Sequence, residues 1–142
     1  TTLFRSYLFM EFLINTLKKA GYKITTGRKS VLDYLFKAGK PVSLKDIQNE
    51  IPDIDFASIY RIINLLLELK VVRKVNFGEK YLRYELEEEN HPHHHHIVCT
   101  KCGCIKKIDL CIVAELEKET NYKILDHNME FFGLCPKCSS KI

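Results

Sequence analysis

Residues 55–86 read DFASIYRIINLLLELKVVRKVNFGEKYLRYEL and carry the strongest fold signal in the chain. Asp55 is a preferred N-cap residue, and apolar side chains recur after it at helical spacing, so we predict an amphipathic helix over residues 56–69. The helix is followed by VVRKVNF and YLRYEL, two runs with strand character that flank the short turn GEK. This order predicts a β-hairpin directly after the helix, as in a winged helix.

Three further helices are predicted upstream of this segment. The first covers residues 3–20 and stops at Gly21, and the second starts at Thr25 or Thr26 and stops at Gly39. A third starts at Ser43, because SLKD places an acidic side chain three residues after a serine, as in a capping box. We therefore predict an N-terminal winged-helix domain over residues 1–84.

The composition of the 142-residue chain excludes several classes of protein. Apolar residues make up 46% and charged residues 28%, which argues against a disordered tail. The apolar N-terminal stretch contains Arg5 and Glu11 and lacks a small-residue cleavage site, so we expect neither a membrane span nor a secretory signal. A cytoplasmic protein without a membrane partner is expected.

Charge is divided unevenly along the chain. Residues 1–83 hold 15 Lys and Arg against 8 Asp and Glu, whereas residues 84–142 hold 7 against 10, within a net charge of +4. The excess of +7 in the first part favours an anionic partner, and the alternative is a chance excess of lysines without a binding role.

The polar face of the helix at residues 56–69 has the side-chain chemistry that reads base edges. We predict DNA contacts on this face by Ser58, Tyr60, Arg61 and Asn64. The predicted hairpin adds cations that suit phosphates, at Arg73, Lys74, Lys80 and Arg83. For Tyr60 and Arg61, the alternative is a purely structural role at a core edge and on a solvated face.

All six cysteines lie in the last third of the chain. CTKC and CPKC each leave two residues between their cysteines, which is the spacing of a zinc knuckle. A closed tetrahedral zinc site is therefore predicted on Cys99, Cys102, Cys135 and Cys138. Cys104 and Cys111 are each either a small buried residue or an additional ligand or redox thiol.

Residues 85–142 are predicted to form a small α/β module around this zinc. IKKI at 105–108 predicts a strand, residues 112–120 a short helix, and residues 122–132 a long strand. So small a module buries little core, so we expect a homodimer that places two winged helices on a palindromic DNA operator. The fold class is α+β, with the winged helix followed by a zinc-containing dimerisation domain.

The histidine run HPHHHH at 91–96 leads directly into the first zinc knuckle. In an extended backbone His94 and His96 point to one face and His93 and His95 to the other, so one run can serve two metal sites. Further donors are available at His127, Glu85, Asp109 and Glu115. The alternative is an exposed polar loop.

Five motifs follow one another along the chain: GYKITTGR, FASIYRIINLL, RYEL, HHHHIVCTKCG and DHNMEFFGLCPKC. In sequence and order they resemble the ferric uptake regulator family, and the resemblance covers nearly the whole chain. The resemblance implies a dimeric, metal-dependent transcription repressor and not an enzyme. It supports Tyr60 and Arg61 as DNA contacts, and it places the structural zinc on the four paired cysteines. Arg28 is a further predicted DNA contact. It also implies two regulatory sites, one at the domain hinge on Glu85, His94 and His96, and one in the dimerisation domain on His93, His95 and His127.

The chain departs from the family pattern at two expected ligands. Lys40 stands where a histidine often precedes the third helix, and Lys107 stands where a carboxylate usually follows the first knuckle, so Asp109 is the substitute ligand. Because a lysine disfavours a neighbouring divalent ion and imidazoles suit zinc, we expect a zinc-responsive regulator, with an iron-, nickel- or peroxide-responsive one as the alternative. A peroxide sensor is expected to carry aspartate at the position of Glu85.

Two alternatives come from other classes of protein. A histidine-rich metal-storage protein would have no need of a basic winged helix. A zinc hydrolase would need a general base beside an open metal site, and no HExxH motif occurs. Metal binding is therefore expected to shift the population toward the orientation in which both winged helices fit one operator.

Overall fold

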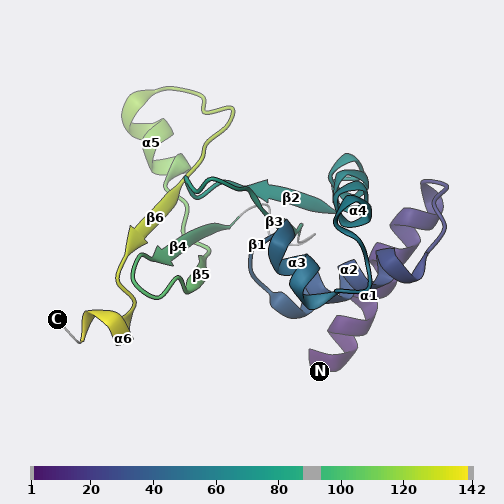
Figure 1. Cartoon of the computed structure of the whole chain (residues 1–142). Coiled ribbons are helices and arrows are strands. Elements are labelled where there is room, and N and C mark those ends of the chain that lie inside the picture. The colour runs from purple at the N-terminus through teal and green to yellow at the C-terminus, as the bar shows by residue number, and fades with distance from the viewer. Residues whose placement is uncertain (1, 88–93, 141–142) are drawn as a thin grey trace. The chain divides into compact units, whose positions relative to one another are not determined.

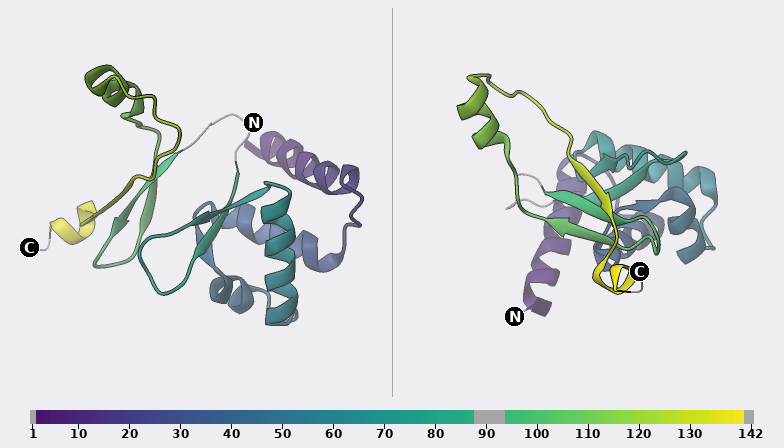
Figure 2. Two further views of the ribbon diagram at one scale, coloured as in Figure 1. Left: turned by 90° about the horizontal axis from the view of Figure 1, so that it is seen from above. Right: turned by 90° about the vertical axis from the view of Figure 1, so that its left-hand side faces the viewer.

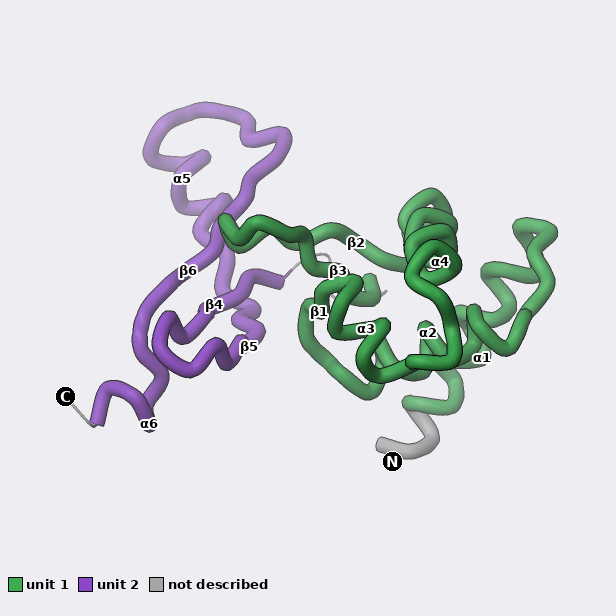
Figure 3. The backbone as a smooth tube through the Cα atoms, in the orientation of Figure 1, with its two compact units in different colours: residues 1–87 green, residues 88–142 purple. Residues whose placement is uncertain are grey.

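The computed structural model describes residues 2–87 and 94–140, which fall into two compact units. Unit 1 covers residues 1–87 and unit 2 covers residues 88–142, as Figure 3 shows in two colours. The division follows residue 87, whereas the sequence analysis placed it after residue 84. Glu85 therefore belongs to unit 1.

Unit 1 contains four helices, which run from purple to teal in Figure 1. They are α1 (Thr2–Lys19), α2 (Thr26–Ala38), α3 (Leu44–Glu50) and α4 (Phe56–Glu68). The side chains of Thr25, Ser43 and Asp55 cap the last three helices by accepting a backbone N–H three residues on. The predicted capping box is present, because Asp46 also accepts the Ser43 N–H.

A small antiparallel sheet completes unit 1. Its strands are β1 (Val42–Ser43), β2 (Val72–Val75) and β3 (Arg83–Leu86), in the order β1-β3-β2. The hairpin is therefore present, but its connection is longer than the predicted turn and spans residues 76–82. The Asn76 side chain accepts the Gly78 N–H, and Glu79 binds Arg83, so these residues turn away from the strand ladder.

The core of unit 1 is built by all four helices. Its fully buried side chains include Leu17, Leu32, Ile47, Ile59 and Leu66. Helix α4 contributes Ile59, Ile63 and Leu66 at helical spacing, which leaves Tyr60 and Arg61 on the outside of the unit. The apolar stripe of α4 thus fixes which of its polar residues face solvent.

Unit 2 is a three-stranded mixed sheet with two short helices. It contains β4 (His95–Cys99), β5 (Ile105–Ile108), α5 (Val113–Thr120), β6 (Glu130–Gly133) and α6 (Pro136–Ser139). The strand order is β5-β4-β6, with β4 antiparallel to β5 and parallel to β6, as the views in Figure 2 allow the reader to follow. Strand β4 is central and pairs on both edges.

The predicted long strand over residues 122–132 is wrong. Only Glu130–Gly133 forms a strand, because β4 offers partners from His96 to Cys99 and pairing ends there. Upstream, Asn121 adopts a left-handed conformation that ends α5, and the Ile124 N–H donates to the Glu117 side chain. His127 therefore lies in a loop and not in a strand.

Unit 2 has hardly any apolar core. Among its described residues, Cys99 is the one hydrophobic residue that is buried, whereas Leu125 and Phe132 are 87% and 54% exposed. Within residues 2–87 and 94–140, no helix has the length and apolar character needed to cross a lipid bilayer. Packing of side chains within unit 2 is therefore too sparse to hold this sheet without further links.

Replacing Leu66 by alanine should lower the free energy of unfolding of unit 1 by about 2–5 kcal/mol, because the buried side chain leaves a cavity that closes only partly. Urea denaturation followed by the helical circular dichroism signal measures this loss. Glu68→Ala, at an exposed position of the same helix, should change the free energy by less than about 0.5 kcal/mol. Equal effects of the two substitutions would contradict the core described above.

Candidate metal centres and nucleic-acid interface

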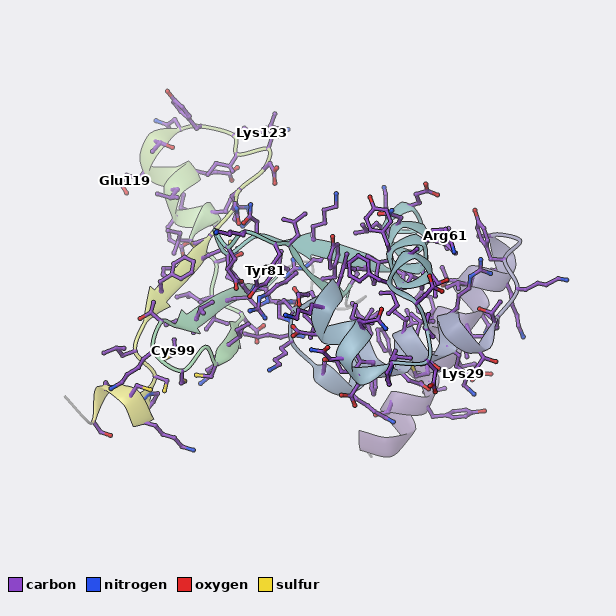
Figure 4. All side chains as sticks on the ribbon, in the orientation of Figure 1. Lys29, Arg61, Tyr81, Cys99, Glu119 and Lys123 are labelled. Carbon is purple, nitrogen blue, oxygen red and sulfur yellow. The ribbon has the colours of Figure 1, made fainter. Side chains whose placement is uncertain are left out.

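A cluster of cysteines lies between the β4–β5 turn and α6. The sulfur atoms of Cys99, Cys102, Cys104 and Cys135 are all within 4.8 Å of one another, and those of Cys102 and Cys135 are 3.8 Å apart. Figure 4 shows sulfur atoms gathered near Cys99. A tetrahedral zinc with bonds of about 2.3 Å separates its sulfur ligands by about 3.8 Å, so the cluster fits this metal.

Backbone N–H groups prepare the cluster for a cation. The N–H groups of Cys102 and Cys135 donate to the Cys99 sulfur and lower the pKa of Cys99 to about 5. The N–H of Cys138 lowers the pKa of Cys135 in the same way. Both side chains therefore favour the thiolate form that binds zinc.

Cys138, a predicted ligand, lies beside this group. Its thiol interacts with the sulfur atoms of Cys135, Cys99 and Cys102, which raises the pKa of Cys138 to about 12. Cys104 interacts with Cys102 and Cys135, which likewise raises its pKa to about 12. The paired motifs predicted four of the thiols around this centre, whereas Cys104 follows Cys102 too closely to be recognised from spacing.

A second donor group contains His95, Cys111 and His127. The Nε2 atoms of the two histidines are 3.3 Å apart, and the Cys111 sulfur lies 3.6 Å from Nε2 of His127. Two imidazoles and a thiol at these distances can hold a divalent metal ion. The sequence predicted the two histidines with His93, which lies outside the described residues, and it left the role of Cys111 open.

The carboxylates predicted for these sites are placed elsewhere. Asp109 and Glu115 are exposed, and neither belongs to a possible metal-binding group within the described ranges. Cys111 is the donor that this part of the chain brings to His95 and His127 instead. The sequence indicated Cys111 only as a residue type that can bind metal, because it has no second cysteine at the spacing of a zinc knuckle.

His94 and His96 lie on the other side of β4 from His95. Their ring centroids are 4.9 Å apart, and Nδ1 of His96 lies 3.5 Å from Oε2 of Glu130. A carboxylate beside one ring nitrogen orients a histidine so that the other nitrogen can bind metal. Sequence reasoning missed Glu130, whose position opposite His96 depends on the parallel pairing of β4 and β6. Lys107 is the antiparallel partner of His96.

Glu85, the carboxylate predicted with these histidines, is held within unit 1. The Arg73 Nε atom donates to Oε1 of Glu85 over 2.7 Å, and the two residues face each other across β2 and β3. The ion pair fixes the side chain of Glu85 at the end of unit 1 that leads into residue 88. A metal at Glu85 has to share this carboxylate with the guanidinium.

The predicted DNA-reading residues lie at the outer face of α4. Asp55 accepts both the N–H and the hydroxyl of Ser58, and the Ser58 oxygen accepts from Arg61 over 3.2 Å. Tyr60 is 52% exposed, Asn64 is half-buried, and Arg61 is exposed on α4 (Figure 4). The structure thus assigns Tyr60 and Arg61 to an accessible helical face and not to the core.

Arg28 lies with this face around one groove. A cavity of about 460 Å³ is lined by side chains of α4 and of the α2 start, among them Arg28, Ser58 and Arg61. Arg28 donates to the Lys23 carbonyl over 2.7 Å and stacks over Tyr22, so its position is fixed. The Arg28 guanidinium and the Ser58 hydroxyl at this groove suit a phosphate.

The hairpin cations divide into two kinds. Arg73 is paired with Glu85, and Arg83 is paired with Glu79 at 2.8 Å and stacks on Phe77 and Tyr81. Lys74 and Lys80 are exposed. The predicted phosphate-contacting role therefore fits the two lysines better than the two arginines.

Comparison with known proteins gives the family of this chain. The model of the ferric uptake regulator family matches residues 19–132. The ferric uptake regulation protein of Bacillus subtilis is 35% identical over 93% of this chain and 98% of its own length. The peroxide-responsive repressor PerR of Staphylococcus aureus is 27% identical, with 93% of each chain covered.

A solved structure agrees with both units. The Helicobacter pylori ferric uptake regulator, described as having three functional metal binding sites, matches with a TM-score of 0.73 and 27% identity, covering 94% of this chain and 93% of its own. The chain belongs to the ferric uptake regulator (Fur) family. It is thus a metal-responsive transcription regulator with an α+β Fur fold, and it is not an enzyme.

Ser58→Ala should raise the pKa of Asp55 part of the way toward its ordinary value, because it removes the hydroxyl that is the largest cause of the lowered pKa and keeps the backbone N–H. A carboxylate with a lowered pKa stabilises the folded state above its unfolded pKa and loses this effect as the pH falls through the folded pKa. The variant should therefore lose the cap of α4 at a higher pH. Carbon-13 NMR titration of the Asp55 carboxyl group measures the shift, and identical titrations in both proteins would contradict it.

Proposed function

We propose that this chain is an iron(II)-responsive transcriptional repressor that binds a palindromic operator as a homodimer. Fur-family regulators bind operator DNA as dimers. Two of the three relatives described above are ferric uptake regulators, and the one from Bacillus subtilis is more similar to this chain than the peroxide-responsive repressor is. Glu85, where a peroxide sensor is expected to carry aspartate, also supports this choice. The relatives favour iron over the zinc expected from the sequence, and Glu85 argues against a peroxide response.

The separation of the nitrogen donors by β4 is the observation that carries the proposal. His94 and His96 contact each other on one side of the strand, and His95 meets His127 on the other. The chain can therefore use one histidine pair for sensing while the other site and the cysteine cluster serve other metals. We assign the sensing site to Glu85, His94 and His96, following the family motifs RYEL and HHHH.

The sensing step follows from where these ligands lie in the chain. Glu85 belongs to unit 1, which carries the DNA-reading helix, whereas both histidines belong to unit 2. A metal ion that binds all three stabilises those arrangements of the two units in which the ligands meet, and so shifts the population toward them. Iron(II) suits a site of two imidazoles and one carboxylate, with selectivity set by geometry and metal availability.

The proposed dimer uses the exposed apolar surface of unit 2. Ile97 and Phe131 are direct neighbours on paired strands, and they are 39% and 41% exposed. Leu110, Leu116 and Phe132 add further apolar surface to the same unit. A second copy is the partner that buries such surface symmetrically and presents two α4 helices to one palindrome.

On the DNA, we assign base contacts to Tyr60, Arg61 and Asn64 on the outer face of α4. Arg28 and Ser58, at the neighbouring groove, bind the phosphate backbone and fix the register of the helix. The exposed Lys74 and Lys80 extend the backbone contacts to the hairpin. The basic half of the chain thereby forms one DNA-binding surface.

A zinc-responsive repressor is the second candidate, and Cys111 is the observation that favours it. A thiolate beside His95 and His127 prefers zinc to iron(II) or manganese(II). The two candidates differ in which site controls DNA binding. In the first candidate the site with Cys111 binds zinc without sensing it, and in the second this site is the sensor.

Iron(II) should raise the affinity for operator DNA by about 5- to 150-fold over the protein that holds structural zinc alone. The measurement is fluorescence anisotropy without oxygen, at fixed salt and pH, with a palindromic duplex selected in vitro by the iron-loaded protein. His94→Ala should abolish the iron response while chelator-resistant zinc stays unchanged. His91→Ala, in the same histidine run but outside the ligand set, should respond like the parent protein.

Two outcomes would overturn the iron proposal. One is an affinity for DNA that iron(II) leaves unchanged and zinc raises. The other is an iron response that His94→Ala retains. A protein that binds the duplex equally with and without every metal would overturn metal-dependent repression as well.

Cys111→Asp should separate the two candidates, because it replaces a thiolate by a carboxylate at the same donor position. The ratio of zinc to iron(II) affinity at this site should fall by about tenfold or more, since carboxylates favour the harder ion. Competition titrations in metal buffers measure the ratio. If iron is sensed through Glu85, the iron dependence of DNA binding should stay as in the parent protein, and a loss of it would favour the second candidate.

A further inference from the structure

The cysteine cluster and the neighbouring Cys138 together offer five thiols, one more than a tetrahedral zinc can bind. Cys104 is within 4.8 Å of Cys99, Cys102 and Cys135 at the ligand atoms. Cys138 interacts with the same three sulfur atoms. The two paired CxxC motifs account for Cys138, and they leave Cys104 without a role.

Cys104 and Cys138 reach the centre from two different elements. Gly103, with a φ of +78°, turns the chain after Cys102, and the Cys99 N–H donates to the Cys104 carbonyl over 2.9 Å. The Gly103 N–H also donates to the Cys99 carbonyl over 2.9 Å, and the two bonds close the β4–β5 turn that brings Cys104 to the cluster. Cys138 comes from α6, a helix of four residues that begins after Cys135.

We propose that Cys104 and Cys138 are alternative fourth ligands of the zinc that Cys99, Cys102 and Cys135 hold. When one of them binds, the other remains beside the metal as a thiol. In the exchange the entering thiol forms a bond to zinc and gives up its proton, and the leaving thiolate breaks its bond and takes up a proton. The charge of the centre and its count of four sulfur ligands stay the same.

The exchange allows α6 to move while zinc stays bound, which a site with four fixed cysteine ligands does not allow. If Cys138 leaves, zinc keeps its bonds to both knuckles, since Cys135 binds from one side and Cys99 and Cys102 from the other. The last helix can then move without loss of the metal that holds β4 near β6. The inference depends on structural zinc at this cluster, and it is independent of which metal the protein senses.

Chelator-resistant zinc in the full-length protein tests the proposal. Cys104→Ser and Cys138→Ser should each retain the zinc content of the parent protein, whereas the double variant should lose it. Because loss of even an outer-shell partner weakens a metal site about 10- to 100-fold, the double variant should yield its zinc at a chelator concentration lower by at least this factor. Lys137→Ala, an exposed residue between the two cysteines of the second motif, is the control.

Cobalt(II) provides a readout of the ligands themselves. In Cys138→Ser the sulfur-to-cobalt charge-transfer absorption should keep the intensity of the parent protein, because Cys104 replaces the lost sulfur. A weaker band, with zinc lost as readily as from the double variant, would overturn the proposal. A parent protein without chelator-resistant zinc would overturn it too, and this outcome is separate from the iron response of DNA binding.

Alkylation of the zinc-loaded parent protein needs no substitution and covers the case in which Cys138→Ser fails to fold. N-ethylmaleimide labelling followed by peptide mass spectrometry should divide the label between Cys104 and Cys138, and leave Cys99, Cys102 and Cys135 protected. Label on Cys104 with none on Cys138 would show a thiol outside the metal's ligand set and overturn the proposal.

Discussion

The alternation of side chains along β4 is the constraint on which unit 2 depends. Successive residues of a strand point to opposite faces, so a run of adjacent histidines is divided between two sites. His95 meets His127 on one face, His94 and His96 meet on the other, and the strand ends at Cys99 in the cysteine cluster. One strand of five residues thereby contributes to three donor groups of different chemistry.

The two units obtain their stability in different ways. Unit 1 buries aliphatic side chains from every helix, as an ordinary small domain does, and Tyr60 and Arg61 of α4 lie on the face opposite its buried stripe. Unit 2 buries almost none among its described residues, and the cysteine cluster links the β4–β5 turn to the segment after β6. A metal ion at this cluster would therefore add a link that the sparse core of unit 2 lacks, whereas the core of unit 1 is complete without one.

Local signals in the sequence predicted the helices well, because capping is a local interaction. Thr25, Ser43 and Asp55 each cap a helix where the sequence indicated it. The strand predicted over residues 122–132 was wrong because a strand needs a partner, and β4 supplies one for four residues only. Glu130 was missed as a site residue, and the roles of Cys104 and Cys111 were left open, for a related reason. A parallel register, a turn and a loop bring these three residues to the other donors, and none of these features has a spacing signature.

The ion pairs in the hairpin of unit 1 change how its charge acts on DNA. The logarithm of the DNA-binding constant falls with the logarithm of the salt concentration, by a slope of about 0.9 for each phosphate that the protein neutralises. The slope therefore reports phosphate contacts and not the number of cations in the sequence. Arg73 and Arg83 already face Glu85 and Glu79. With these two arginines paired, a hairpin that bound DNA through Lys74 and Lys80 would release fewer counterions than one with four unpaired cations. The affinity of such a hairpin for DNA would then vary less with ionic strength than its count of basic residues suggests.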